Sequence, residues 1–472
     1  MPSSTPCAGP GSVTSPSMSS GIRPASSTAS RAAWASNSSA LCPARRPNAV
    51  CPIPAMTIDF AMVLIIARKL SDTQQPLTAR RSSATATGET SVDRTWSEEH
   101  ELLRRSLRDY VHERVTPNVL AWEAAGEVPR SLFTDLAALG VLGLRLSPQY
   151  GGGGQDFWFT VVLLEELMRC GSIGVPVSVM AHAEFATMLI DRYGSPALRE
   201  TYVRGAAEGR LIGALGVSEP DAGSDVAALR TRAVRDGDHY VINGSKLYIS
   251  NGTIADYITL AVRTGGAGSR GLSVIVVPAD TPGLRRQRLR KLGTHASDTA
   301  ELFFENCRVP ASHLLGAEND GFGMIMSGFE GERLVLSVMA CSHARLMFEQ
   351  ARDWGHQRRA FGQPLLGFQV WQHRLADVLT RIVAAEALTL RGIELHLQGR
   401  PAQSEISMAK LFATETARFA ATECAQIQGG LGYMEECLMG RLHRDALAMT
   451  IGAGSSEIMR EIIARSNHLV AQ

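Results

Sequence analysis

The chain has 472 residues, several times the ~100–150 residues of a typical domain, which predicts two or three domains or one large composite. Its 47 Lys and Arg residues balance 46 Asp and Glu residues, and the formal net charge of +1 argues against a nucleic-acid-binding protein. No apolar stretch reaches the ~18–20 residues that span a bilayer. Eight scattered cysteines without a CxxC pair indicate neither a zinc site nor a disulfide framework, so we expect no metal.

Residues 1–90 form a leader whose composition differs from that of the remaining chain. They are rich in Ser, Thr, Pro and Ala, and no acidic residue precedes Asp59. Because such a segment cannot bury enough apolar surface to fold, we predict disorder there. Of the 47 basic residues only four are Lys, a bias that fits a GC-rich genome. We therefore favour a bacterial cytoplasmic protein whose start was assigned too far upstream; the alternative is a transit peptide for the mitochondrial matrix.

Helical periodicity dominates residues 91–211, which we predict to form an N-terminal α domain. Ser97 and the acidic residues after it supply the N-cap of a first amphipathic helix. Two features interrupt the helical run: a loop of four glycines at 151–154 and a helix restart at 194–196.

Between residues 212 and 316 the period changes to two, which predicts a middle β domain. Strand-like runs begin at Tyr240, Tyr257 and Leu272, and Asn-Gly pairs at 243–244 and 251–252 provide turns. Long helical patterns return over residues 317–472, a C-terminal α domain. The order α, β, α predicts an α+β protein.

A GxGxxG sequence at 266–271 matches the dinucleotide-binding fingerprint and follows a predicted strand. A diphosphate site needs a helix after the glycines, because the amides of its first turn face the phosphates. Here the next segment is β-branched and leads to Pro278, so we predict a hairpin loop and no dinucleotide site.

Six motifs occur in the order and spacing of the acyl-CoA dehydrogenases, which the chain resembles over about residues 95–465. They are GVSEPDAGSD at 216–225, INGSKLYISNG at 242–252, KLGTHASDT at 291–299, RRAFG at 358–362, QIQGGLGY at 426–433 and RD at 444–445. The resemblance implies a middle β-barrel or sandwich and a C-terminal four-helix bundle. It also implies FAD as cofactor, a homotetramer or dimer, oxidation of an acyl-CoA to the trans-2-enoyl-CoA, and electron transfer to electron-transferring flavoprotein.

The resemblance also implies two groups of FAD-binding residues. Leu215, Val217 and Ser218 are expected to face the flavin ring, with Tyr248 and Ser250 against its other side. The family more often has Trp at the Tyr248 position, so we expect altered flavin stacking here. The second group is expected to reach the FAD of a neighbouring subunit and comprises Arg358, Phe361, Gln369, Gln426 and Gly430. The guanidinium of Arg358 suits a diphosphate, because its fork donates two hydrogen bonds.

Three further residues resemble contacts to nucleotide groups. Ser224 resembles the residue that contacts the CoA arm of the substrate. Ser455 and Glu457, at the start of the last predicted helix, resemble contacts to the cofactor, and helix N-terminal amides favour such anionic ligands.

The reaction requires a carboxylate that removes the α proton of the thioester while flavin N5 takes the β hydride. Many family members supply this carboxylate from a Tyr-Glu-Gly-Thr loop near the C-terminus, where this chain has Ala453. Either the protein is inactive or the base comes from another position.

Glu332 is the candidate for that other position. It lies on an apolar stripe that includes Phe329 and Leu336 at helical spacing, where desolvation raises a carboxyl pKa toward the working pH. From this pattern alone, a structural glutamate paired with Arg333 or another basic residue is the favoured reading. The resemblance to the isovaleryl-CoA and long-chain acyl-CoA dehydrogenases, which carry the base on a helix, assigns the base to Glu332. It also places Glu330, Arg333, Gly452 and Ala453 on the substrate side, with the Ala453 N–H as donor to the thioester oxygen.

Two alternative functions stay open on the same fold. One is an oxidase or flavin hydroxylase that uses oxygen, and the other is an inactive or regulatory flavin-binding homologue or partner subunit. The acyl chain is also open: the Gly452-Ala453 pair resembles the isovaleryl subgroup, whereas 298–304 and 456–461 resemble the long-chain subgroup. We favour a medium, long or branched chain over a short linear one.

Overall fold

The computed structural model describes residues 96–470. The described residues belong to one compact unit. The predicted disorder of residues 1–90 lies outside the described residues.

The first part of the described chain is helical, as predicted, and is built around α5, a helix buried on most sides. Ser97 caps the first helix through a hydrogen bond from the His100 N–H, and the glycines at 151–154 lie in a loop. The principal helices are α2 (Glu98–Tyr110), α3 (Val119–Ala125), α4 (Arg130–Ala138), α5 (Phe157–Met168), α6 (Gly174–Met180), α7 (Met188–Tyr193), α8 (Pro196–Leu198) and α9 (Arg204–Ala207). Short π and 3-10 turns join several of them.

The middle part is a seven-stranded sheet that curls as a half-barrel, which confirms the predicted β domain. Its strands are β1 (Gly213–Gly216), β2 (Arg232–Asp236), β3 (His239–Ser250), β4 (Tyr257–Arg263), β5 (Leu272–Pro278), β6 (Leu284–Arg288) and β7 (Thr299–Pro310). They lie in the order β1-β4-β2-β3-β7-β6, with β5 also paired to β4. Strand β3 loses its register against β7 between Lys246 and Ile249, so the strand is distorted where the second flavin motif lies.

The glycines at 266–271 lie between β4 and β5, which pair antiparallel from Tyr257 opposite Pro278 to Arg263 opposite Leu272. No helix follows them. The predicted hairpin loop is confirmed.

The last part consists of long helices that pack side by side. They are α10 (Gly321–Gln357), α11 (Gln369–Leu397), α12 (Gln403–Gln428), α13 (Leu438–Met449) and α14 (Ser456–Ser466), and a small hairpin of β8 (Arg359–Ala360) and β9 (Gln363–Pro364) joins α10 to α11. Buried alanines such as Ala409, Ala413 and Ala417 let α12 approach α10 and α11 closely.

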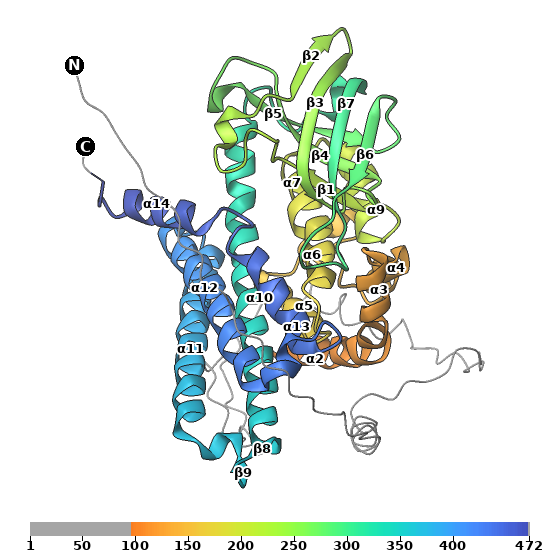
Figure 1. Ribbon diagram of the computed structural model, residues 1–472. Helices are drawn as coiled ribbons and strands as arrows, with labels where there is room; N and C mark the ends of the chain where they lie inside the picture. The colour runs from red at the N-terminus through yellow and green to blue at the C-terminus, as the bar shows by residue number, and fades with distance from the viewer. Residues whose placement is uncertain (1–95, 471–472) are drawn as a thin grey trace, which may run out of the picture. The chain divides into compact units, whose positions relative to one another are not determined.

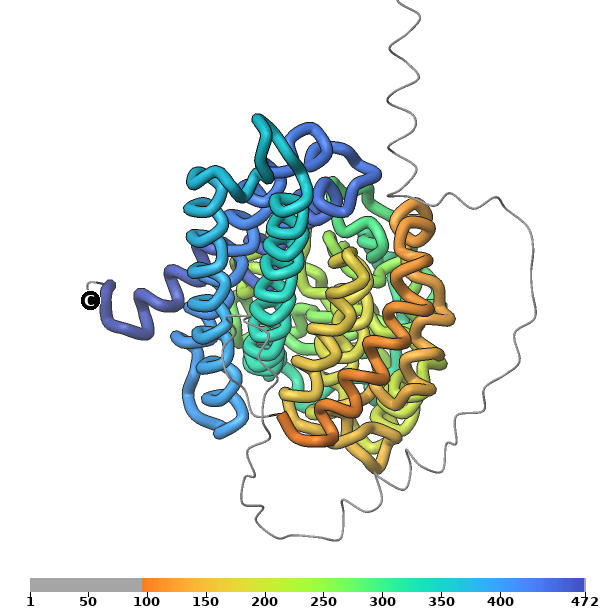
Figure 2. The backbone as a smooth tube through the Cα atoms, turned by 90° about the horizontal axis from the view of Figure 1, so that it is seen from below, coloured from red at the N-terminus to blue at the C-terminus, as the bar shows by residue number. Residues whose placement is uncertain are grey.

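Helix α10 is the central element of the described chain (Figure 1). At its start Gly321 lies against Ser273 of the sheet, and farther along the helix packs on α5, α11 and α12. Figure 2 shows it between the N-terminal helices and the other C-terminal ones. Helix α10 therefore contacts all three parts of the protein. Within residues 96–470, no helix is long and apolar enough to cross a membrane.

Candidate active site

Glu332 lies near the middle of α10 and is buried, with 8% of its surface exposed. Its Oε1 atom is inaccessible to solvent and accepts no hydrogen bond from the described residues. Burial raises the pKa of this carboxyl to about 7, and the charge of Arg333 lowers it only in part. A carboxyl that is desolvated, unpaired and half ionised near neutral pH has the properties of a general base.

The C-terminal loop of residues 451–455 lies directly against this part of α10. Arg333 is 5% exposed, and its Nε donates a hydrogen bond of 3.3 Å to the Ala453 carbonyl. A methyl group at Gly452 would lie 3.9 Å from Cδ2 of Leu336, one turn beyond Glu332. The structure thus brings together residues that are about 120 positions apart in sequence. Glu330 is half-buried on the same helix and acts electrostatically on Arg333.

The backbone of this loop is unusual at two successive residues. Ala453 has a φ of 52° and Gly454 a φ of 93°, both in the left-handed region, which costs an alanine ~1 kcal/mol. The Ala453 N–H donates to no acceptor among residues 96–470. It is therefore available to a ligand.

A buried ion pair holds the loop after β1, which contains Val217 and Ser218. Lys246 is fully buried on β3, and its Nζ donates to the Val217 carbonyl at 2.9 Å and to Glu219 Oε1 at 2.8 Å. The Leu247 N–H adds a bond of 2.9 Å to the Ser218 carbonyl. These contacts fix the loop after β1 on β3, and so bring Val217 and Ser218 near the motif that contains Tyr248 and Ser250.

Tyr248 occupies the irregular part of β3 with a φ of 64°, and 69% of its surface is exposed. An exposed aromatic ring on a strained strand is available for stacking, which fits the predicted role beside a flavin. Ser250 and Leu215 are half-buried, whereas Val217 is buried. The first group of predicted FAD residues is thus assembled on β1 and β3.

The second group of predicted FAD residues lies at the other end of α10. Position Gly355 is close to Ile427 and Leu366, which places the β8–β9 hairpin beside the end of α12. Phe361 on this hairpin is 96% exposed, and the Arg358 guanidinium makes no ion pair within the described chain. At 1.5 Å per residue, a helix of 37 residues is about 55 Å long. The two groups therefore do not meet within one chain (Figure 1).

The structure shows few contacts for the three residues that are predicted to bind nucleotide groups. Ser224 is exposed on the loop after β1. Ser455 occupies the N-cap position of α14 without a capping hydrogen bond from its side chain, and Glu457 lies in the first turn. No contact in the described structure joins Ser224 to Glu332.

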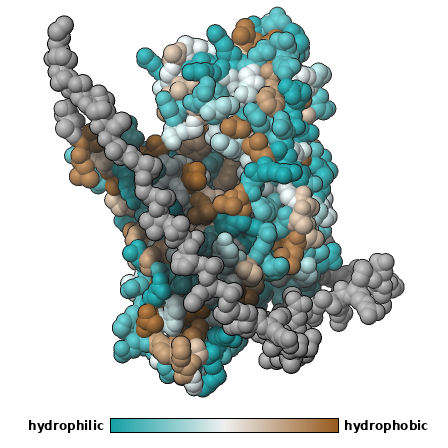
Figure 3. All heavy atoms as spheres, viewed as in Figure 1, coloured by the Kyte–Doolittle hydropathy of each residue, from teal (hydrophilic) through white to brown (hydrophobic). Residues whose placement is uncertain are grey.

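These residues fit FAD by their chemistry. The exposed Tyr248 ring suits the flavin, the free fork of Arg358 suits the diphosphate, and a side chain added at Gly429 or Gly430 would meet no atom within 4 Å, so a ligand can approach the backbone there. Figure 3 shows that this face of the molecule is hollowed between the C-terminal helices and the middle domain, with apolar side chains gathered in the hollow. An apolar hollow suits an acyl chain.

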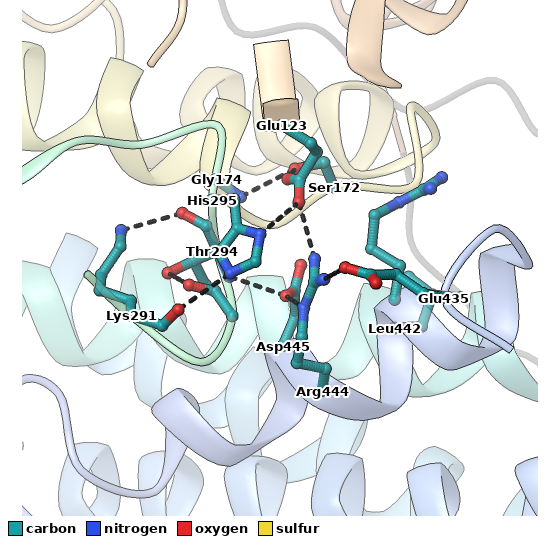
Figure 4. Close-up of polar contacts among 12 residues, drawn as sticks. Glu123, Ser172, Gly174, Lys291, Thr294, His295, Glu435, Leu442, Arg444 and Asp445 are labelled. Atoms are coloured by element: carbon teal, nitrogen blue, oxygen red, sulfur yellow. Dashed lines mark hydrogen bonds and ion pairs between the residues drawn. The ribbon is translucent and has the colours of Figure 1, made fainter. Parts of the chain in front are cut away.

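A second buried polar cluster joins the three parts of the protein (Figure 4). Glu123 of α3 accepts a bond of 2.7 Å from Arg444 of α13 and one of 3.2 Å from the Ala296 N–H between β6 and β7. Asp445 accepts a bond of 2.7 Å from the Thr294 N–H. Burial raises the pKa of Asp445. The motifs at 291–299 and 444–445 therefore meet as a joint between domains.

Four residues that hold loops near the site were not singled out from the sequence: Lys246 and Glu219 hold the loop after β1, Glu123 the loop between β6 and β7, and Lys410 the loop of residues 451–455. One signal was available: the lysines of this Arg-rich chain are few, and those at 246, 291 and 410 all lie in its folded part.

The comparisons with known proteins agree with this geometry. Three acyl-CoA dehydrogenase family models match successive parts of the chain: the N-terminal domain at residues 97–210, the middle domain at 214–307 and the C-terminal domain at 319–468. The mitochondrial long-chain specific acyl-CoA dehydrogenase of Sus scrofa is 36% identical over 378 residues, which cover 79% of this chain and 87% of that protein. The mitochondrial isovaleryl-CoA dehydrogenase of Pongo abelii is 35% identical over 377 residues, 78% and 89% of the two chains.

A solved structure is also similar. The glutaryl-CoA dehydrogenase from Mycobacterium smegmatis in complex with FADH2 superposes with a TM-score of 0.75 at 30% identity, over 80% of this chain and 96% of that one. The fold and site define a flavin-dependent oxidoreductase. The chain belongs to the acyl-CoA dehydrogenase family, and its cofactor is FAD.

Proposed function

We propose that the protein oxidises an acyl-CoA thioester to its trans-2-enoyl-CoA, with Glu332 as the general base. The observation that supports this assignment most strongly is the unpartnered, buried Oε1 of Glu332 beside the loop of residues 451–455. A structural glutamate at such depth is normally paired.

In this mechanism Glu332 takes the α proton from the substrate. With a pKa of about 7, a substantial fraction of the carboxyl is ionised at neutral pH, and it gives up no hydrogen bond when it accepts the proton. FAD, when bound, supplies the acceptor for the hydride that leaves the β carbon. The low exposure of Glu332 also limits proton exchange with water.

The loop of residues 451–455 stabilises the charge that develops on the thioester oxygen. The free Ala453 N–H is the proposed donor, and Arg333 holds the carbonyl of the same residue. Hydrogen bonds to an oxygen that gains negative charge in the transition state contribute much of the rate enhancement in such reactions.

The FAD contacts support an oligomer. Leu215, Val217, Ser218, Tyr248 and Ser250 hold the flavin of their own subunit. The residues that lie about one helix length away serve the cofactor of a neighbour and comprise Arg358, Phe361, Gln369, Gln426 and Gly430. The proposed assembly is a homotetramer, with a dimer as the alternative. Ser455 and Glu457 contact the cofactor from the start of α14.

The proposed substrate is a medium, long or branched acyl-CoA. Gly452 and Ala453 leave space beside the reacting carbons, and Ser224 meets the CoA arm. Electron-transferring flavoprotein is the proposed acceptor. The proposed location is the bacterial cytoplasm, on the Arg bias of the sequence.

An anaerobic titration of the purified yellow protein with a panel of acyl-CoAs tests the function. We expect medium, long or branched members to bleach the flavin absorbance with one equivalent of substrate. Bleaching by none of them would favour a non-catalytic flavoprotein. Rapid reoxidation by air with release of hydrogen peroxide would favour an oxidase.

A further inference from the structure

Lysine is rare in this chain, and its positions follow a pattern. Three lysines lie among the described residues, and each directs its ammonium at a backbone carbonyl. Lys246 holds the Val217 carbonyl, Lys291 holds that of Thr294 and Lys410 that of Gly454. An ammonium is a compact point charge with three donors, which suits a narrow buried site. Each of the three described lysines thus holds a loop through a backbone carbonyl.

Lys410 lies in α12, and its side chain is fully buried. Its Nζ donates a hydrogen bond of 2.6 Å to the Gly454 carbonyl. Arg333, from α10, donates to the carbonyl of the preceding residue, Ala453. Two cations on two different helices thus hold two successive carbonyls of one loop.

Both held residues have left-handed backbone conformations. Without external contacts, the loop would relax toward ordinary φ values, because Ala453 is strained at 52°. A hydrogen bond from a charged donor is stronger than one between neutral groups, so two such bonds offset the strain of one left-handed alanine. The held carbonyls fix the two peptide planes that follow Ala453. The Ala453 N–H lies in the preceding plane, which is joined to them at the Ala453 Cα, so its direction is set once the φ of 52° is kept.

From this geometry we infer that Lys410 is a positioning residue, which with Arg333 locks the loop of residues 451–455 so that the Ala453 N–H points at the thioester oxygen. This inference rests on the proposed function. Lys410 touches neither substrate nor cofactor; it acts through the Gly454 carbonyl. Its positive charge also favours the negative charge that the thioester oxygen gains when the α C–H bond breaks and the proton passes to Glu332.

The electrostatic surroundings of Lys410 are mixed. Burial, together with the charge of Arg333 of α10, lowers its pKa to about 8, and Glu457 of α14 and Glu415 of α12 oppose this shift in part. At pH 7 the ammonium is charged. The experiment is therefore done at pH 7.

The test uses the holoenzyme and a substrate analogue with sulfur in place of carbon 3. Such a 3-thiaacyl-CoA loses its α proton but has no hydride to give from position 3, so the reaction stops at the deprotonated thioester. Its long-wavelength absorbance beside the oxidised flavin measures the ratio of deprotonated to intact analogue. The chain length is that of the acyl-CoA that bleaches the flavin fastest.

We expect Lys410→Met to lower this ratio at least ~10-fold and the rate of flavin reduction ~10–100-fold, less than the ~10²–10³-fold typical for loss of a donor itself. Lys410→Gln, which keeps a shorter donor, should give an intermediate ratio and serves as the second variant if the Met variant folds poorly. FAD content should stay at the parent level in both. Lys291→Met is the matched control: it removes a half-buried lysine from a different loop and should leave the ratio unchanged.

An unchanged ratio in a folded, FAD-loaded Lys410 variant would overturn the inference, as would an equal fall in the Lys291→Met control. A parent enzyme that never deprotonates the analogue would instead refute the proposed function.

Discussion

Two glutamates of this protein are buried to the same degree but have opposite properties. Glu219 is 7% exposed and accepts bonds from the Lys246 ammonium, the Arg230 N–H and the Thr231 N–H. Glu332 is 8% exposed, and its Oε1 accepts none.

The pKa values of the two carboxyls move in opposite directions. Burial would raise the pKa of Glu219, but the charge and hydrogen bond of Lys246 hold it below its ordinary range. Burial raises that of Glu332 to about 7. The number of donors, and not depth, therefore distinguishes a carboxylate that holds the fold from one that can take a proton.

The largest effect is expected when the base is moved. Glu332→Ala should lower the rate of flavin reduction by at least ~10²–10⁴-fold, because a positioned base is lost. Adding Ala453→Glu should restore a measurable part, since the loop of residues 451–455 approaches the same part of α10. Rapid mixing with substrate measures both variants.

The single variant Ala453→Glu is the control for this relocation. Two carboxyls in one apolar site force one of them to hold a proton, so this variant should be slow. No recovery in a folded, FAD-loaded double variant would show that a side chain at position 453 does not reach the α carbon.

Breaking the buried ion pair of Glu219, a contact that Glu332 does not have among residues 96–470, should affect stability. Glu219→Gln leaves the Lys246 ammonium buried without a counter-charge, which typically costs about 3–5 kcal/mol of the free energy of unfolding. We expect lower thermal stability and weaker FAD retention, measured by calorimetry and by flavin absorbance. The double variant Glu219→Gln/Lys246→Met should recover part of the stability, and a single variant as stable as the parent would show that the pair does not hold the loop.

Whereas loss of the Glu219 charge should lower the stability, loss of the Glu332 charge should raise it at high pH. Its native pKa of about 7 exceeds the ordinary value of 4.5, so the native state binds the proton more tightly. Its contribution to stability is fully present below pH 4.5 and lost as the pH rises through 7, a difference of roughly 3 kcal/mol.

Glu332→Gln carries no charge to bury at any pH. It should match the parent in stability near pH 5 and exceed it near pH 8, as thermal melts of the two holoenzymes would show. A constant difference between the two pH values would indicate that Glu332 does not titrate near 7.

Much of the fold could be predicted from local patterns. The change of period from 3.6 to 2 and back marks the three parts, and the apolar stripe around Phe329 and Leu336 places Glu332 on the buried side of a helix. The glycines at 328 and 331 are poor helix formers, but α10 is continuous through both.

The supporting contacts could not be predicted in the same way. The bond from Lys410 to Gly454 joins positions 44 residues apart, and that from Arg444 to Glu123 joins positions 321 apart. Such pairs leave no periodic trace in the sequence. The left-handed backbone of Ala453 and Tyr248 was equally hidden, because neither residue type favours a positive φ.

The central claim is that Glu332 is the base, and the pH dependence of flavin reduction tests it most directly. Rapid anaerobic mixing with substrate should show a parent rate that rises with pH through about 7, as Glu332 ionises. Glu332→Gln should be at least ~10²-fold slower at every pH. The control Glu386→Gln alters a glutamate of α11 that is paired with Arg345 of α10, and it should keep the parent pH profile. If Glu332→Gln reduces its flavin at the parent rate with the same pH profile, Glu332 is a structural residue and the mechanism is wrong.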